Sequence, residues 1–388
     1  MAFVPLNLLV THNGKSKRQH VTCVYKCGDA CSKPVRNTSD NEYFGDVVKA
    51  VSRRSMLQAG GVAVLAVGAG SVLAACGTDE KPAATATSSV PPAETPPGMK
   101  FNSVAPNSED AVVIPEGYEQ AVVISWGDPV LPGAPQFDVR AQTAAAQRQQ
   151  FGFNADFAGL MPIPGAQNRY LLVISHEYTS EPFMFFGYNG DPTREQFDIA
   201  IAAHGLTVLE VEKRDGALVP VMGRYNRRIT ADTPMTLIGP AAGSDFVKTT
   251  ADPAGRTVAG TFNNCGGGVT PWGTVLSAEE NFNQYFGAPE GAEAPNPVTA
   301  DRFDRYGIDF EPSERKWEGF DPRFDLAKTP NEPNRFGYVV EVNPWDPEST
   351  PVKHSALGRF KHEAATIYVT DDGTVVAYSG DDERFDYL

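Results

Sequence analysis

Apolar runs of strand length recur through the last two thirds of the chain, and few segments have the periodicity of an amphipathic helix. Two turn sequences, Arg214-Asp215-Gly216 and Asp371-Asp372-Gly373, each lie between two such runs and predict β-hairpins. The pattern therefore predicts an all-β fold. We expect strands at 121–125, 170–175, 206–212, 218–222, 257–262, 273–277, 337–342, 365–369 and 374–379.

Residues 288–335 interrupt this pattern with acidic, aromatic and Pro-rich sequence. We predict a surface insertion or lid there. The 36 glycines and 31 prolines of the chain agree with a fold of many short strands and turns.

A weak internal repeat predicts a circular arrangement of the strands. Three predicted strands end alike, in VISHE, VLSAE and AYSGD, and Ser175, Ser277 and Ser379 are each 102 residues apart. If a propeller blade takes about 40 to 50 residues, this interval is two blades, and the following acids face one central channel. Chance spacing is the alternative. The acids so aligned are Glu177, Glu279 and Asp381.

Candidate chemistry is concentrated in residues 261–286. Cys265 offers a thiolate, and the three glycines 266–268 let the backbone of a wrapping turn approach an ion closely. Glu279 and Glu280 repel one another unless they lie in water or beside a cation. The alternative is a small buried cysteine and a solvated acidic pair.

The beginning of the chain has the pattern of an export signal. Arg53 and Arg54 precede a Gly/Ala/Val/Leu run that ends in Leu73-Ala74-Ala75-Cys76, which resembles a twin-arginine signal with a lipoprotein cleavage site. A simple membrane anchor is the alternative. We predict a cytoplasmic leader at 1–51, the signal and lipobox at 52–77, a Pro/Ala/Thr/Ser linker at 78–105 and the folded domain at 106–388.

Cysteine usage favours metal binding by the exported domain. Cys76 is the predicted lipidation site, and Cys23, Cys27 and Cys31 lie in the leader, where we assign them no role. Cys265 is therefore the one cysteine of the exported part and has no intramolecular disulfide partner there. A lone thiol in an oxidising compartment is a liability unless it is buried or bound to metal.

The charge of the chain excludes some functions. The net charge is −15, and without residues 1–75, which hold nine Lys/Arg and four Asp/Glu, it becomes 24 − 44 = −20. Such a surface attracts cations and argues against nucleic acid as a partner. The sequence contains no G-x-S-x-G elbow, no phosphate-binding P-loop and no HExxH motif.

Three long motifs resemble the PhoX family of bacterial alkaline phosphatases over residues 110 to 388. They are NNCGGGVTPWGTVLSAEENF, NRFGYVVEVNPWDPESTPVKHSALGRFKHEAA and YSGDDERFDYL. The resemblance implies a β-propeller that hydrolyses small phosphate monoesters with iron and calcium. The chain ends at Leu388 inside a family motif, so we expect a partial propeller that lacks its C-terminal blades.

The resemblance also implies roles for individual residues. Cys265 corresponds to an iron ligand, and Glu280 and Glu363 to carboxylate ligands. We assign four further acids to calcium or its surroundings, namely Glu177, Glu279, Asp381 and Asp382. Asn263 and Asn264 are the predicted substrate-binding residues.

The expected protein is a secreted or envelope-anchored metallophosphatase that uses the twin-arginine export machinery. A propeller that binds calcium without catalysing a reaction is the alternative. The sequence does not identify the natural ester.

Overall fold

The structure is a computed structural model, and it describes residues 101–293 and 296–383. The chain divides into two units, Met1–Gly117 and Tyr118–Leu388, and every helix and strand named below belongs to the second. The predicted leader and export signal, with Arg53, Arg54 and Cys76, lie outside the described residues. Within the described part, no helix is long and apolar enough to cross a membrane.

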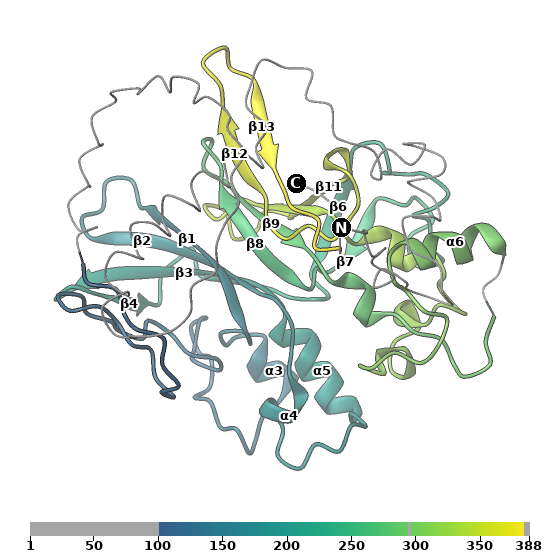
Figure 1. Cartoon of the computed structure of the whole chain (residues 1–388), viewed down its shortest axis with the longest axis horizontal. Helices are drawn as coiled ribbons and strands as arrows, with labels where there is room; N and C mark the ends of the chain where they lie inside the picture. The colour runs from purple at the N-terminus through teal and green to yellow at the C-terminus, as the bar shows by residue number, and fades with distance from the viewer. Residues whose placement is uncertain (1–100, 294–295, 384–388) are drawn as a thin grey trace, which may run out of the picture. The chain divides into compact units, whose positions relative to one another are not determined.

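The first sheet has five antiparallel strands, in the order β1-β2-β3-β4 with β5 also paired to β3 (Figure 1). The predicted hairpin between β3 and β4 is confirmed. Its two-residue loop, Asp215 and Gly216, has φ angles of 51° and 87°, which this tight turn requires. The strands are β1 (Ala155–Pro162), β2 (Arg169–His176), β3 (Gly205–Arg214), β4 (Ala217–Val221) and β5 (Arg227–Ile229).

The second sheet has six strands in the order β7-β6-β11-β10-β9-β8, and only the β6–β11 pair is parallel. Apolar side chains from both large sheets form one buried cluster, which includes Val173 and Val208 of the first sheet and Val275 and Val340 of the second. The strands are β6 (Pro234–Ile238), β7 (Thr257–Ala259), β8 (Asn264–Val269), β9 (Val275–Glu279), β10 (Val339–Val342) and β11 (Val352–His354).

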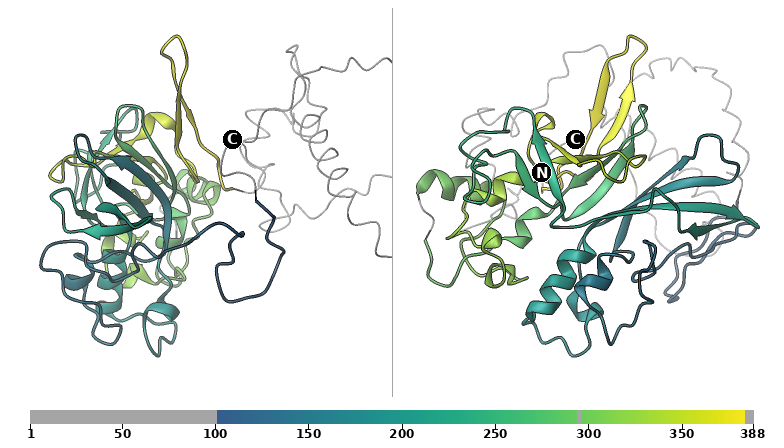
Figure 2. Two further views of the ribbon diagram at one scale, coloured as in Figure 1. Left: turned by 90° about the vertical axis from the view of Figure 1, so that its left-hand side faces the viewer. Right: turned by 180° about the vertical axis from the view of Figure 1, so that it is seen from behind.

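The third sheet is a hairpin of β12 (Thr366–Val369) and β13 (Val375–Tyr378), at the yellow end of the chain in Figures 1 and 2. Its turn contains the predicted Asp371-Asp372-Gly373. Strand β8 contacts β1 and β2 of the first sheet and β12 of the third. It therefore lies where the three sheets meet.

The Gly-rich segment is a strand, where a wrapping turn was predicted. Gly266 to Gly268 form the middle of β8. A Cβ atom on Gly266 would lie 2.5 Å from the carbonyl oxygen of Glu363, and one on Gly268 would lie 2.3 Å from that of Ala365. The glycines thus permit a close backbone approach, as expected, but the approaching group is the segment that leads into β12.

The prediction of a surface insertion at 288–335 is wrong for its aromatic part. Trp317 and Phe324 are almost fully buried, and they pack with Phe197, Phe262 and other rings in an aromatic core. Within the described residues, this segment contains four short helical elements. They are α6 (Pro297–Arg305), η5 (Trp317–Gly319), η6 (Pro322–Phe324) and η7 (Glu332–Arg335).

The other helices are also short. Helix α5 is capped by a reciprocal pair of hydrogen bonds between Thr193 and Gln196, and its buried face includes Phe197 of the aromatic core. The remaining helices are α3 (Ala144–Gln147), α4 (Glu181–Met184), α5 (Arg194–Ala203), η4 (Phe282–Tyr285) and η8 (Ser355–Leu357).

One predicted strand does not form. Residues 121–125 have no strand pairing, and Val122 is 82% exposed, while Val123 and Ile124 pack on a small apolar cluster. Their β-branched side chains favour extended backbone, but a strand also needs a partner. The other predicted strands are confirmed, with shifted ends. All-β is thus correct for the sheets, with a few short helices added.

Candidate metal centre

Three hairpins of the fold repeat one local register. In each of the pairs β1–β2, β8–β9 and β12–β13, two residues face one another at the open end of the hairpin. Before the regular pairing begins, the first strand then has one residue more than the second. Such an extra residue is a β-bulge, which redirects side chains. The facing pairs are Ala155↔His176, Asn264↔Glu279 and His362↔Asp381.

The residue after each facing pair carries a potential metal ligand. On the first strands these residues are Asp156, Cys265 and Glu363, and on the second strands they are Glu177, Glu280 and Asp382. The second set is held in the same way each time by a backbone N–H bond across the hairpin. The bonds are Glu177 to Asn154 at 3.1 Å, Glu280 to Asn263 at 2.9 Å and Asp382 to Lys361 at 3.0 Å.

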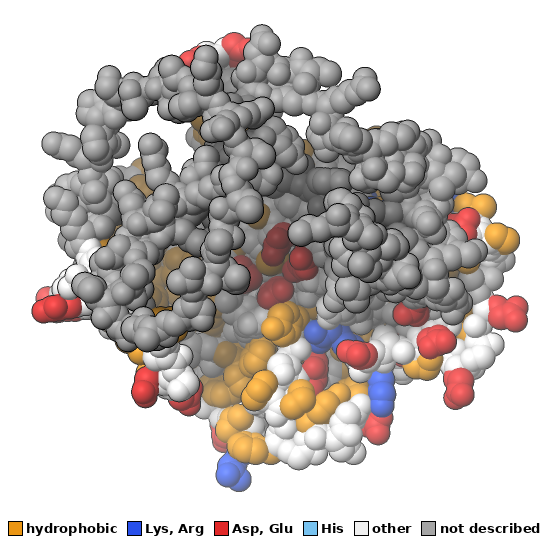
Figure 3. Space-filling view, viewed as in Figure 1, with side chains coloured by type: hydrophobic (Ala, Val, Ile, Leu, Met, Phe, Trp, Pro, Cys, Tyr) orange, Lys and Arg blue, Asp and Glu red, His pale blue; other side chains and the backbone are white. Residues whose placement is uncertain are grey.

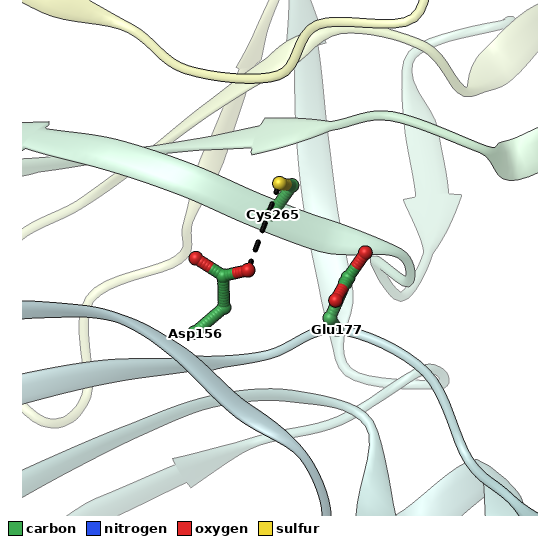
Figure 4. Close-up of side chains that lie close together, drawn as sticks. All are labelled: Asp156, Glu177 and Cys265. Atoms are coloured by element: carbon green, nitrogen blue, oxygen red, sulfur yellow. Dashed lines mark hydrogen bonds between the residues drawn. The ribbon is translucent and has the colours of Figure 1, made fainter. Parts of the chain in front are cut away.

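These side chains converge from the three hairpins. One ligand atom from each of Asp156, Glu177 and Cys265 lies within 4.8 Å of the other two (Figure 4). The Cys265 thiol donates to Oδ2 of Asp156 at 3.7 Å. Figure 3 shows several acidic side chains close together near the middle of this face.

Three further acids, Glu280, Glu363 and Asp382, interact electrostatically with this group. Burial, followed by the carboxylates of Asp382 and Glu177, raises the pKa of Glu280 to about 8. Burial and the Asp156 carboxylate raise the pKa of Glu177, to which Glu363 also contributes. We call these six residues, Asp156, Glu177, Cys265, Glu280, Glu363 and Asp382, the donor cluster.

The Cys265 thiol is held protonated in the absence of a cation. Burial raises its pKa far above the ordinary value, and the charges of Asp156 and Glu280 raise it further. A cation would reverse this effect, because it favours ionised thiolate and carboxylate. Thiolate is a ligand of transition metals, while clustered carboxylate oxygens suit calcium. The donor cluster therefore fits a centre containing both kinds of metal.

A family model described as alkaline phosphatase PhoX matches residues 99–388. The chain belongs to the PhoX alkaline phosphatase family. A solved structure of Pseudomonas fluorescens PhoX in complex with vanadate, a transition-state analogue, is 46% identical, with a TM-score of 0.70. The match covers 73% of this chain and 49% of that one, so the chain spans about half the length of that relative. The comparison with curated proteins found no match.

The structure places Glu279 outside the donor cluster of this PhoX family member. Its carboxylate is fully buried and accepts hydrogen bonds from the Lys353 ammonium at 2.6 Å and the Thr261 hydroxyl at 2.7 Å. The N–H groups of Gly337 and Tyr338 bind its other oxygen at 3.0 and 3.2 Å. With both oxygens engaged, Glu279 forms a structural ion pair, and we leave it out of the predicted ligands.

The repeat seen in the sequence differs from the structural repeat by one residue. It aligned Glu177 with Glu279, whereas the shared register aligns Glu177 with Glu280. A shift of one residue turns a strand side chain to the other face, which explains why Glu280 joins the donor cluster and Glu279 does not. The interval of 102 residues also leads from one sheet to a neighbouring sheet. The sequence had predicted that this interval spans two blades.

Asp381 occupies the position equivalent to Glu279. Its Oδ1 accepts bonds from the N–H groups of Lys361 and Glu383, and its Oδ2 lies 4.0 Å from Arg305. These contacts stabilise the turn that carries Asp382. We therefore place Asp381 beside the donor cluster and Asp382 in it.

The two asparagines predicted to bind substrate are buried and engaged by the protein. Asn264 is fully buried and donates to Thr261 and Ser277. The side chain of Asn263 is bonded to Tyr285 and to the backbone of Asn281. The Asn264 side chain stabilises the site from inside, whereas Asn263 also lines the pocket described below.

Sequence reasoning missed Asp156, although a signal was present. The segments Phe153-Asn154-Ala155-Asp156 and Phe262-Asn263-Asn264-Cys265 share the pattern Phe-Asn-x-ligand. In both, the asparagine has a left-handed backbone, with φ of 52° at Asn154 and 51° at Asn263. Asparagine tolerates this conformation better than most residues.

A pocket of about 450 Å³ adjoins the donor cluster. Glu177 belongs to both, and Tyr178, Tyr188, Arg315 and Asn281 also line the pocket. The Arg315 guanidinium donates to the carbonyl and hydroxyl of Thr179, at 3.2 and 3.1 Å. The pocket is thus a polar space beside the potential metal ligands.

Proposed function

We propose that this chain provides metal ligands of a phosphatase that hydrolyses phosphate monoesters at an iron and calcium centre. The observation that carries this proposal is the donor cluster, in which five carboxylates and one thiol occupy equivalent positions of three hairpins. Family membership and the vanadate complex of the relative support it. The chain spans about half the length of that relative, so we state its phosphatase activity as a proposal.

The proposed ligands follow from the chemistry of the donors. Cys265 holds iron, together with Glu280 and Glu363, because thiolate favours a transition metal. Glu177, Asp382 and Asp156 provide oxygen ligands for calcium. Asp156 is added to the ligands predicted from the sequence because it lies against the Cys265 thiol.

The metals, when bound, supply positive charge that neutralises phosphate oxygens and activates an oxygen nucleophile. The contribution of the chain is to fix the ligands before substrate arrives, using bulges and cross-hairpin N–H bonds. Bound cations also offset the repulsion between an acidic protein and an anionic ester. The adjoining pocket offers space for the organic part of that ester.

We also propose that the three sheets are consecutive blades of a propeller, with β1, β8 and β12 facing its axis. The contacts of β8 with β1 and β12 support this arrangement. A propeller places equivalent residues of each blade around one channel, which would account for the meeting of the three hairpins.

Export and anchoring remain part of the proposal. The twin-arginine route suits a protein that folds around its metals before export, and Cys76 would carry the lipid.

The proposal is tested with two variants of the cluster and one matched control. Glu280→Gln and Cys265→Ser should each lose iron, the visible absorption band and hydrolysis of p-nitrophenyl phosphate, since neutral groups replace anionic ligands. Glu341→Gln, in neighbouring strand β10, should retain all three.

Metal analysis accompanies each assay. Retention of a full iron complement in Cys265→Ser would contradict the ligand assignment. Metal bound by the wild-type protein without phosphatase activity would favour a calcium-binding module that catalyses no reaction.

A further inference from the structure

A chain of buried hydrogen bonds leads from helix α5 to the donor cluster. It starts at His204, directly after α5, which is 1% exposed. The ring nitrogen Nδ1 lies 2.7 Å from the carbonyl oxygen of Ala200, and Nε2 lies 2.9 Å from the hydroxyl of Tyr285. The Tyr285 oxygen lies 3.3 Å from Nδ2 of Asn263.

The direction of each hydrogen bond is determined by its first acceptor. A carbonyl oxygen can only accept, so Nδ1 of His204 carries the proton. Burial, and then the charge of Arg315, lowers the pKa of His204 to about 3, so the ring is neutral and Nε2 is an acceptor. Tyr285 donates its proton to Nε2, and burial keeps it protonated by raising its pKa to about 12.

This direction fixes the side chain of Asn263. Because the Tyr285 oxygen has donated its only proton to His204, it must accept from Asn263, and only the NH₂ group can donate. The amide oxygen then faces the N–H of Asn281, at 2.6 Å. A rotation of the Asn263 amide that exchanges its oxygen and its NH₂ group would lose the hydrogen bonds to both Tyr285 and Asn281.

Asn263 in turn holds two members of the donor cluster. Its carbonyl oxygen accepts from the N–H of Cys265 at 3.1 Å and from the N–H of Glu280 at 2.9 Å. Its left-handed backbone, with φ of 51°, directs that carbonyl toward both strands. One residue therefore sets the relative positions of the thiol and a carboxylate from two neighbouring strands.

We infer that His204 and Tyr285 are positioning residues, which orient Asn263 and through it fix the spacing of Cys265 and Glu280. Neither touches the donor cluster itself. Their relevance to metal binding rests on the proposed function, but the positioning can be measured in metal-free protein.

The first test replaces one hydroxyl. Tyr285→Phe keeps the ring, which packs on Phe262 at a centroid distance of 4.3 Å, and removes both hydrogen bonds. We expect the amides of Cys265, Glu280 and Asn281 to exchange hydrogen about tenfold faster in the metal-stripped full chain.

The control for this test is Tyr338→Phe. Tyr338 is also buried, and its hydroxyl donates to the carbonyl of Asn334 at 3.0 Å, outside the chain of bonds. Equal exchange at the three amides in both variants would overturn the inference, because loss of any buried hydroxyl would then suffice.

The second test separates the two nitrogens of His204. Glutamine can place an acceptor near the position of Nε2, whereas asparagine reaches only the position of Nδ1. We expect His204→Gln to retain slow exchange and His204→Asn to exchange as fast as Tyr285→Phe. Equally fast exchange in both histidine variants would show that the imidazole acts by packing alone.

A calcium titration of the same proteins links the positioning to the centre. Outer partners of metal ligands typically contribute 10- to 100-fold in affinity, so Tyr285→Phe should bind calcium about tenfold more weakly than Tyr338→Phe. If the wild-type chain binds no calcium, the proposed function fails, while the amide exchange still decides the role of His204 and Tyr285.

Discussion

At the scale of single residues, the contrast between Glu279 and Glu280 shows how neighbours acquire different roles. Glu279 faces the interior and is neutralised by Lys353 at 2.6 Å. Glu280 faces other acids, and its pKa is raised to about 8. The first stabilises the sheet, while the second is one of the metal ligands that we propose.

The raised pKa of Glu280 predicts a pH effect on the metal-stripped protein. An ordinary glutamate has a pKa of 4.5, so between 4.5 and about 8 the native state holds a proton that the unfolded state has lost. The free energy of unfolding should therefore fall as pH rises through this window, on the order of a few kcal/mol.

Urea unfolding at several pH values measures this effect. Glu280→Gln should flatten the fall without abolishing it, because the pKa of Glu177 is also raised. Added calcium should oppose the fall, since it binds the ionised acids. An unchanged pH dependence in the variant would show that other groups cause it.

Sequence reasoning identified five of the six cluster residues but not how they meet. Cys265 and Glu280 stood out by their residue types, whereas Asp156 is a single acid between an alanine and a phenylalanine. Its role comes from the bulge, which depends on pairing with a strand about twenty residues later. The sequence repeat aligned Glu279 with Glu177 because a one-residue bulge cannot be seen in a comparison of strand ends.

At the scale of secondary structure, the glycines of β8 determine how closely two sheets approach. Gly266 and Gly268 lie on one face of the strand, against the carbonyl groups of Glu363 and Ala365. Since Glu363 belongs to the donor cluster, the absence of side chains in one strand sets the place of a ligand from the next sheet. The sequence showed the need for close approach but not the approaching segment.

This contact predicts the effect of one added methyl group. Gly268→Ala would place Cβ 2.3 Å from the Ala365 carbonyl oxygen, so β12 must move away. We expect a loss of about 1 to 3 kcal/mol in unfolding free energy, together with weaker calcium binding. Chemical unfolding and a calcium titration measure the two effects.

Gly319→Ala is the matched control. Nothing lies within 4 Å of the Cβ that it would add, and its backbone is not left-handed. Its stability and calcium affinity should therefore stay close to those of the wild-type protein. If the two alanine variants behave alike, the close contact does not hold the third sheet in place.

At the scale of the whole molecule, the strand pattern predicted the sheets better than their assembly. Apolar runs of strand length identified β2, β3 and β4, but β6 and β11 pair in parallel across more than 100 residues. The aromatic segment 288–335 read as surface because its charged residues surround Trp317 and Phe324. Long-range pairing and burial of this kind leave no local pattern.

The proposed route of export gives a prediction for the complete chain. Replacing Arg53 and Arg54 by lysine should retain the precursor inside the cell, because the twin-arginine machinery recognises the arginine pair. Cell fractionation and immunoblotting measure this. Cys76→Ala should still be exported but carry no lipid label, and normal export of the double-lysine variant would exclude the twin-arginine route.

The shared register of the three hairpins also separates the backbone frame from the donors that it carries. Asp156, Cys265 and Glu363 occupy the same place in three copies of one local structure, yet they differ in charge and in softness. The local backbone is therefore the same in all three hairpins, and a single sulfur atom distinguishes one of them. Exchanging the aspartate and the cysteine between the first two hairpins would move the sulfur to the neighbouring hairpin, and the preferred position of a soft metal should follow it.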